Sequence, residues 1–114
     1  MGLKQSFFYY LTKFIMSTRA TITVSNNDDA FHIYVHWYWY PEIVIPLIEK
    51  ALNFAWDFPR YEAWDFATAI IRVMKTRAGG IYLTKDAELH SDRDFHYEVT
   101  ELLWNLSIKV TPFK

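Results

Sequence analysis

The stretch FHIYVHWYWYP, residues 31–41, is the part of the chain around which the expected fold is arranged. Successive side chains of a strand point to opposite faces of a sheet, so this stretch predicts one apolar and one polar face. The apolar face would carry Phe31, Ile33, Val35 and Trp37, and the polar face His32, Tyr34, His36 and Tyr38. Apolar residues favour the core, whereas histidine and tyrosine suit a binding or wet surface. Pro41 should end the strand, because proline cannot continue a central strand.

The residues on either side of this stretch predict a first hairpin followed by two helices. Ala20, Ile22 and Val24 alternate with polar residues and precede the turn formers of residues 26–29, as in an antiparallel hairpin. One amphipathic helix should start between Pro41 and Pro46, and a second should run from about residue 60 to 77. The glycine pair at residues 79–80 should stop the second helix.

Three further strands are expected at residues 81–84, 95–100 and 105–111, the last two with clear alternation of apolar and polar residues. The predicted fold class is therefore α+β. We expect the order ββααβββ and an antiparallel sheet with two helices on one face. Residues 16–114 should form this single domain.

Residues 1–15 are expected to be an N-terminal extension of the domain. Phe7, Leu11, Phe14 and Ile15 share one helical face, which predicts a short amphipathic helix. This helix is either an appendage or a docking or interfacial element. The run is too short and too interrupted for a membrane span, and it lacks the cleavage site of a signal peptide.

The composition excludes several classes of function. The chain has 114 residues, no cysteine and a net charge of −1, so it has no thiol chemistry and no general attraction to nucleic acid or anionic membrane. The absence of cysteine is typical of a cytoplasmic protein. Aromatic residues make up 19% of the chain, a high share that predicts either a dense aromatic core or aromatics shown to a partner.

Short motifs along the chain resemble a group of small, uncharacterised phage and prophage proteins. They are STRA-x-I at residues 17–22, Tyr34-x-His36 with Tyr40-Pro41-Glu42, and His90-x-Asp92 before an aromatic strand. The resemblance spans residues 16 to about 110. It implies a phage accessory protein that binds a component in the host cytoplasm. The chain departs from the group at Tyr38-Trp39, where the group has Asp-Gly, and at Ser91, where it has glycine. The apolar replacements suggest a surface specialised, or engineered, for contact.

Two apparent surface corners carry bulky apolar residues where turn formers are expected. One is Trp39-Tyr40, and the other is the turn at residues 102–104, which contains no glycine. Together they could form the kind of apolar patch that marks an interaction site. The predicted partner-binding residues are His36, Tyr38, Trp39, Tyr40, Leu102, Leu103 and Trp104. The partner would be a host protein, for which this chain is an inhibitor or adaptor, or a second copy in a homo-oligomer.

A second interpretation uses the polar sheet face. Its histidines and aspartates would converge if their strands are neighbours, and imidazole with carboxylate is a ligand set for divalent metals. These candidate metal or ligand residues are His32, His36, His90, Asp92, Asp94 and His96. They would make the protein a small-ligand or metal-binding protein, or a hydrolase. The chain as a whole favours a binding protein over an enzyme, with no catalytic residue assigned and no cofactor apart from this divalent metal.

Overall fold

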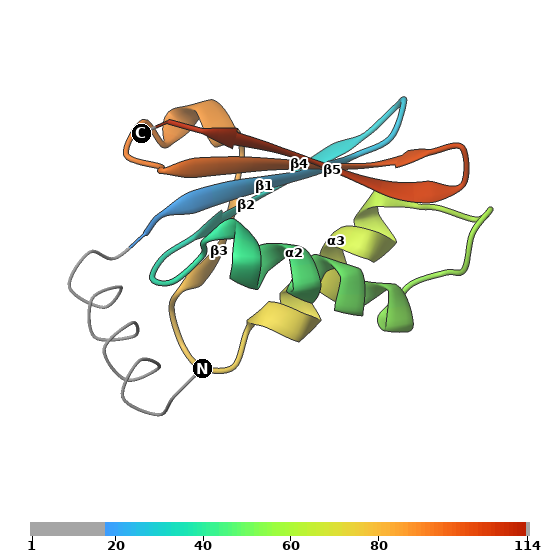
Figure 1. Ribbon diagram of the computed structural model, residues 1–114, viewed down its shortest axis with the longest axis horizontal. Coiled ribbons are helices and arrows are strands. Elements are labelled where there is room, and N and C mark those ends of the chain that lie inside the picture. Colours follow the sequence, from blue (N-terminus) through green and yellow to red (C-terminus); the bar gives the residue numbers. More distant parts are fainter. Residues whose placement is uncertain (1–17, 114) are drawn as a thin grey trace.

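The computed structural model describes residues 18–113, which form a five-stranded sheet covered on one face by two helices (Figure 1). The α+β class and the order ββααβββ are confirmed. The predicted extension at residues 1–15 lies outside the described residues. No helix within residues 18–113 is long and apolar enough to cross a membrane.

The helices and strands lie close to the expected segments. Their bounds are β1 Ala20–Ser25, β2 Ala30–Val35, α2 Pro41–Lys50, η1 Ala51–Phe54, α3 Ala63–Met74, β3 Ile81–Thr84, η2 Ala87–Leu89, β4 Phe95–Leu102 and β5 Asn105–Pro112. Helix α2 begins at Pro41, because proline at the first helical position loses no hydrogen bond. Pro46 therefore lies inside the helix and does not start it.

The sheet is mixed, and the expectation of a purely antiparallel sheet is wrong. The strand order is β3-β2-β1-β4-β5, and β1 pairs with β4 in parallel while the other neighbours are antiparallel. The parallel pair aligns Ala20 with Phe95 and Val24 with Val99. Alternation within a strand does not encode the direction of its neighbour, so the pattern could not reveal this pairing.

The parallel pair requires a crossover connection, because β3 and β4 lie on opposite sides of the β2-β1 pair. Residues 85–94 make this connection. They include η2, which lies on the face of the sheet opposite the helices (Figure 1). Arg93 anchors the connection, and its side chain is 7% exposed. Its guanidinium donates to Thr21 Oγ1 at 3.1 Å and to the Ala87 carbonyl at 2.9 Å, and it pairs with Glu88 at 3.1 Å.

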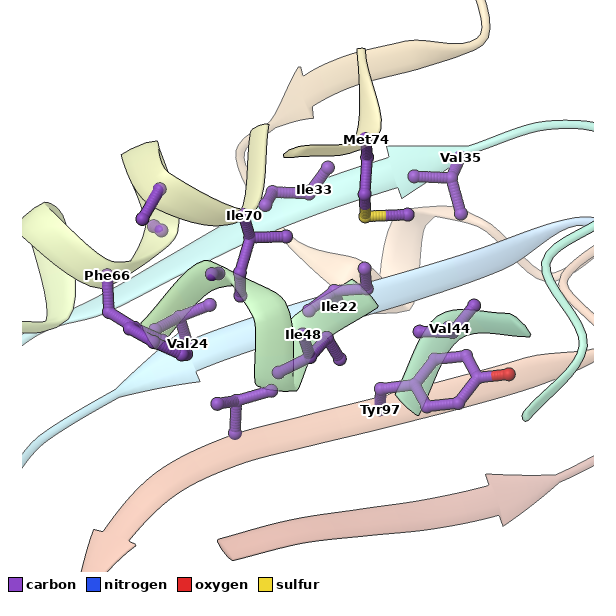
Figure 2. Close-up of a cluster of buried hydrophobic side chains, with 14 of the residues drawn as sticks. Ile22, Val24, Ile33, Val35, Val44, Ile48, Phe66, Ile70, Met74 and Tyr97 are labelled. Carbon is purple, nitrogen blue, oxygen red and sulfur yellow. The ribbon is translucent and has the colours of Figure 1, made fainter. Parts of the chain in front are cut away.

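The core lies between the sheet and the two helices (Figure 2). Ile22 and Val24 of β1 are fully buried, because β1 is the central strand and α3 covers it. Tyr97 is fully buried under α2, and its hydroxyl donates to the Trp39 carbonyl at 2.8 Å. Burial of a tyrosine ring is favourable when its hydroxyl keeps a hydrogen-bond partner. This bond joins β4 to the segment that enters α2.

Strand β2 ends at Val35, whereas Trp37 was expected to be the last residue on its apolar face. Trp37 has φ 88°, a left-handed conformation that breaks the strand alternation. Its ring lies against Gly80, where an added Cβ would come within 2.2 Å of the ring. Arg77 stacks on the ring at 4.4 Å. Trp37 is therefore held by a glycine and an arginine beyond the strand, and it does not continue the apolar face of β2.

We expect Gly80→Ala to destabilise the protein more than Gly79→Ala. Both glycines have φ above 70°, so each substitution carries the left-handed cost of about 1–2 kcal/mol. Only the new Cβ at residue 80 meets the Trp37 ring, whereas the one at residue 79 meets the hydroxyl of Tyr82 at 3.3 Å, the end of a flexible side chain. Overpacking should lower the free energy of unfolding by a further ~1–3 kcal/mol in Gly80→Ala, as measured by urea denaturation. Equal losses in the two variants would contradict the close packing of Trp37 on Gly80.

Candidate functional site

Two of the predicted histidines are held on the polar face of the sheet by threonines of β1. His32 Nδ1 lies 2.9 Å from Thr23 Oγ1, and His96 Nδ1 lies 2.7 Å from Thr21 Oγ1. The pairing of β1 with both β2 and β4 creates these contacts, because it places each imidazole directly opposite a threonine. Burial lowers the pKa of His96, and the nearby Arg93 charge adds to this effect.

The crossover brings His90 and Asp92 onto Tyr34 of β2. The His90 ring stacks on the Tyr34 ring with centroids 3.8 Å apart, and the Tyr34 hydroxyl donates to Asp92 Oδ2 at 2.7 Å. Arg19 Nε lies 3.4 Å from the same carboxylate oxygen. Burial and the bond to Asp92 raise the pKa of Tyr34 to about 12. Burial raises the pKa of Asp92, but the Tyr34 hydrogen bond and the Arg19 charge outweigh it and hold that pKa below its usual value.

His36 lies beside this cluster, at the end of β2. Its ring meets the Tyr34 ring edge-on at 4.7 Å and lies 5.4 Å from the Tyr82 ring. Burial and the Arg19 charge lower its pKa, which favours the neutral imidazole. Its Nε2 atom is buried without a hydrogen-bond partner among residues 18–113.

The predicted metal ligands share one face of the sheet but do not converge. Within residues 18–113, no group of three histidine, aspartate or glutamate side chains could hold a metal ion. Several of these groups instead bond to other side chains or to the backbone of the protein. His90 Nε2 lies 2.7 Å from Thr84 Oγ1, and Asp94 Oδ2 accepts from the Arg19 backbone N–H at 3.0 Å. The arrangement therefore acts chemically as a set of structural hydrogen bonds.

The predicted partner-binding residues lie at two opposite ends of the sheet. The Tyr40 ring lies 5.9 Å from the ring of Phe95, the first residue of β4, whereas Leu102 is the last residue of that strand. At about 3.3 Å per residue, the seven intervening steps separate the two ends by roughly 23 Å. Trp39 is half-buried against the core. The structure thus does not bring Trp39 and Tyr40 together with Leu102, Leu103 and Trp104 in one patch.

The hairpin tip of β4 and β5, residues 102–104, is the more exposed of the two groups. Leu103 is 83% and Trp104 68% exposed, and Leu102 is also exposed. Leu102 pairs with Asn105, which leaves Leu103 and Trp104 as a two-residue turn with φ values of 50° and 62°. Positive φ at both central positions is the type I′ pattern, which normally takes asparagine and glycine. In the structure the tip projects beyond the end of the sheet (Figure 1).

Two arginines organise the polar face. The position of Arg19 before the first strand predicts either a carboxylate partner on the sheet or an anionic ligand, and the structure pairs Arg19 with Asp92. The structural role of Arg93 was not predicted, because the sequence offered Arg93 only as a partner for an anion. Their roles depend on the crossover, which brings Arg93 to Thr21 and Asp92 to Arg19 across more than seventy positions of sequence. The only local signal was the position of Arg93 beside two aspartates.

The depressed pKa of His96 predicts a loss of stability at mildly acidic pH. Below the ordinary histidine pKa of 6.5, the unfolded chain takes up a proton that the folded chain does not, so the free energy of unfolding falls as the pH falls. The lowered pKa of His36 also makes the free energy of unfolding fall as the pH falls. We expect His96→Gln to flatten this dependence between pH 7 and 5.5, by at most about 1.4 kcal/mol per pH unit. Denaturant unfolding at both pH values measures the slope. Parallel pH profiles for the two proteins would contradict the assignment.

Comparisons with known proteins found no relative of this chain. No family model matches the chain, and no curated protein and no solved structure matches it either.

Proposed function

We propose that this protein acts by protein–protein contact, and that its contact element is the hairpin tip of residues 102–104. In this proposal it is a small accessory protein of the phage type that inhibits a host protein or serves as its adaptor. The observation that supports the proposal is the placement of leucine and tryptophan, both highly exposed, at the two left-handed positions of the turn.

Neither packing nor backbone preference accounts for these two residues. A left-handed conformation costs about 1–2 kcal/mol for an ordinary L-residue, and bulky side chains are unusual there. Exposed apolar side chains gain nothing from burial in the folded chain. A residue whose backbone conformation and solvent exposure are both unfavourable in the folded protein is a candidate for a role in binding. Tryptophan is also enriched among the residues that dominate the energy of protein interfaces.

The hairpin presents the tip in a defined geometry. The Glu101 carboxylate accepts from the Trp104 backbone N–H at 3.1 Å, and the Asn105 side-chain amide donates to the Leu103 carbonyl at 3.1 Å. These two bonds give hydrogen-bond partners to the backbone N–H of Trp104 and the backbone carbonyl of Leu103. A preorganised apolar loop loses less conformational entropy on binding, so more of its contact energy appears as affinity.

Three other exposed aromatic rings in the described chain differ from the tip, because each contacts a charged side chain. Arg60 lies over the Trp56 ring at 3.7 Å, Arg72 lies over Phe54 at 4.2 Å, and the Trp64 indole donates to Glu62 at 3.1 Å. All three rings are less exposed than Trp104. The tip is therefore the better candidate for a surface that awaits a partner.

The double variant Leu103→Asn, Trp104→Gly separates binding from folding. Asparagine and glycine are the preferred residues of a type I′ turn, so the free energy of unfolding should rise by about 1 kcal/mol. Association should be lost, because both apolar side chains are gone. Urea unfolding measures the first effect. Light scattering over a wide concentration range and capture of bacterial proteins on immobilised protein measure the second.

Leu83→Thr is the matched control. Leu83 is 78% exposed on β3, at the opposite edge of the sheet from β5, and threonine retains strand propensity. This variant should bind as the wild type does. If the tip variant associates like the wild type, or if the wild type binds neither itself nor another protein, the proposal is wrong.

A further inference from the structure

Strand β5 is an open edge of the sheet, and it lacks most of the features by which edge strands avoid pairing. Among residues 18–113, β4 is its only neighbouring strand. Edge strands are commonly very short, bulged or interrupted by proline, and the other edge of this sheet, β3, has only four residues. Strand β5 has eight residues, and its ladder with β4 runs without a bulge from Asn105 to Pro112. Its outer backbone is therefore available to a further strand.

The hairpin register determines which backbone groups of β5 point away from the sheet. Leu102 and Asn105 flank a two-residue turn, so they form a hydrogen-bonded pair, and such pairs recur at every second residue. The Phe113 N–H donates to the Asp94 carbonyl at 2.9 Å, which agrees with this alternation at the other end of the ladder. The odd-numbered residues of β5 thus bond to β4. The residues whose N–H and C=O groups point outward are Leu106, Ile108 and Val110.

Ile108 is also the midpoint between two exposed apolar ends of the hairpin. Leu103 of the tip precedes it by five positions, and Phe113, which is 48% exposed, follows it by five. Trp104 and Pro112 are likewise each four positions away from it. An antiparallel pair of β5 strands centred on Ile108 therefore brings the tip of one copy level with the exposed end of the other.

We infer that a partner of the hairpin tip is a second copy of this chain, joined edge to edge through β5 about a two-fold axis at Ile108. The inference rests on the proposed function, because the tip supplies part of the contact. In this register the outward groups of Leu106 meet those of Val110 in the other copy, and Ile108 meets itself. These three side chains are half-buried and lie on the same face as the buried Tyr97 and Val99. They pack against their counterparts across the axis.

The charges of the strand are compatible with self-pairing in this register. Lysine on an edge strand often prevents pairing. Lys109, however, lies beside Glu98 of β4 and faces Ser107 of the second copy, so two lysines do not meet directly. An axis at Lys109 instead would oppose the two lysines, and it would set Pro112, which has no N–H, against Leu106. With a net charge of −1, two copies repel each other little.

Hydrogen exchange of the full chain, measured by NMR at increasing protein concentration, tests the pairing. In the monomer the amides of residues 106, 108 and 110 should exchange fast, whereas β4 protects those of residues 107 and 109. Where nine-tenths of the chains are dimeric, exchange at residues 106, 108 and 110 should slow about tenfold. Sedimentation equilibrium on the same samples measures the dissociation constant of the dimer.

Substitution of Ser107 tests the register with matched variants. Relative to Ser107→Gln, Ser107→Glu places a carboxylate opposite Lys109 of the second copy and should lower the dissociation constant. Ser107→Lys opposes two ammonium groups and should raise it. Two symmetry-related pairs contribute, so each change should be about two- to thirtyfold. General repulsion between copies predicts the opposite order, because glutamate makes the net charge more negative and lysine makes it less so.

The Leu103→Asn, Trp104→Gly variant distinguishes failure of this inference from failure of the proposed function. It should weaken the dimer without changing which amides of β5 become protected. If it dimerises like the wild type while those amides are protected, the proposed contact of the tip is wrong and the pairing of the β5 edges is supported.

The inference is overturned if the wild type remains monomeric up to ~1 mM. Association that leaves residues 106, 108 and 110 unprotected also overturns it, as does a failure of the two charged Ser107 variants to shift the dissociation constant in opposite directions. Capture of a bacterial protein through the tip would support the proposed function under each of these results.

Discussion

The parallel pairing of β1 with β4 is the constraint on which the rest of this structure depends. It places the fourth strand on the far side of the first, so the chain must pass from β3 across the whole polar face. That passage is stable because the Arg93 charge is buried with hydrogen-bond partners on both sides, Thr21 of β1 and Ala87 of η2. An unpaired buried charge would be prohibitively costly, so this arrangement ties the crossover to the sheet.

The crossover determines which surfaces remain available for function. It brings His90 and Asp92 onto Tyr34, and Tyr34, Asp92 and Arg19 contact one another there. The polar face is consequently more a structural layer than an open site. The two ends of the sheet remain: an exposed apolar tip at one end, and an apolar groove lined by Trp37 and Trp39 at the other. Backbone strain occurs at both ends, in Trp37 and in the Leu103-Trp104 turn.

These two ends suit different roles because their geometry differs. The tip is a hairpin turn whose two apolar side chains are highly exposed, as expected for a contact with a partner. The groove is concave and apolar, with lining residues from α2, α3, the loop after β2 and the start of β3.

The amino-acid sequence by itself determined the class, the order of elements and most of the core. The period-two alternation of β1 and β4 and the helical spacing of α3 are local properties, and each encodes which face is apolar. The tip at Leu103 and Trp104 was visible in the sequence as a surface corner without turn formers, although its left-handed backbone was not. Only the tertiary structure decided that β1 and β4 are parallel, that Trp37 leaves the strand to pack on Gly80, and that the two apolar corners lie far apart. The reason is physical: alternation specifies a face of a strand, whereas the direction and identity of its neighbours depend on contacts between residues distant in sequence.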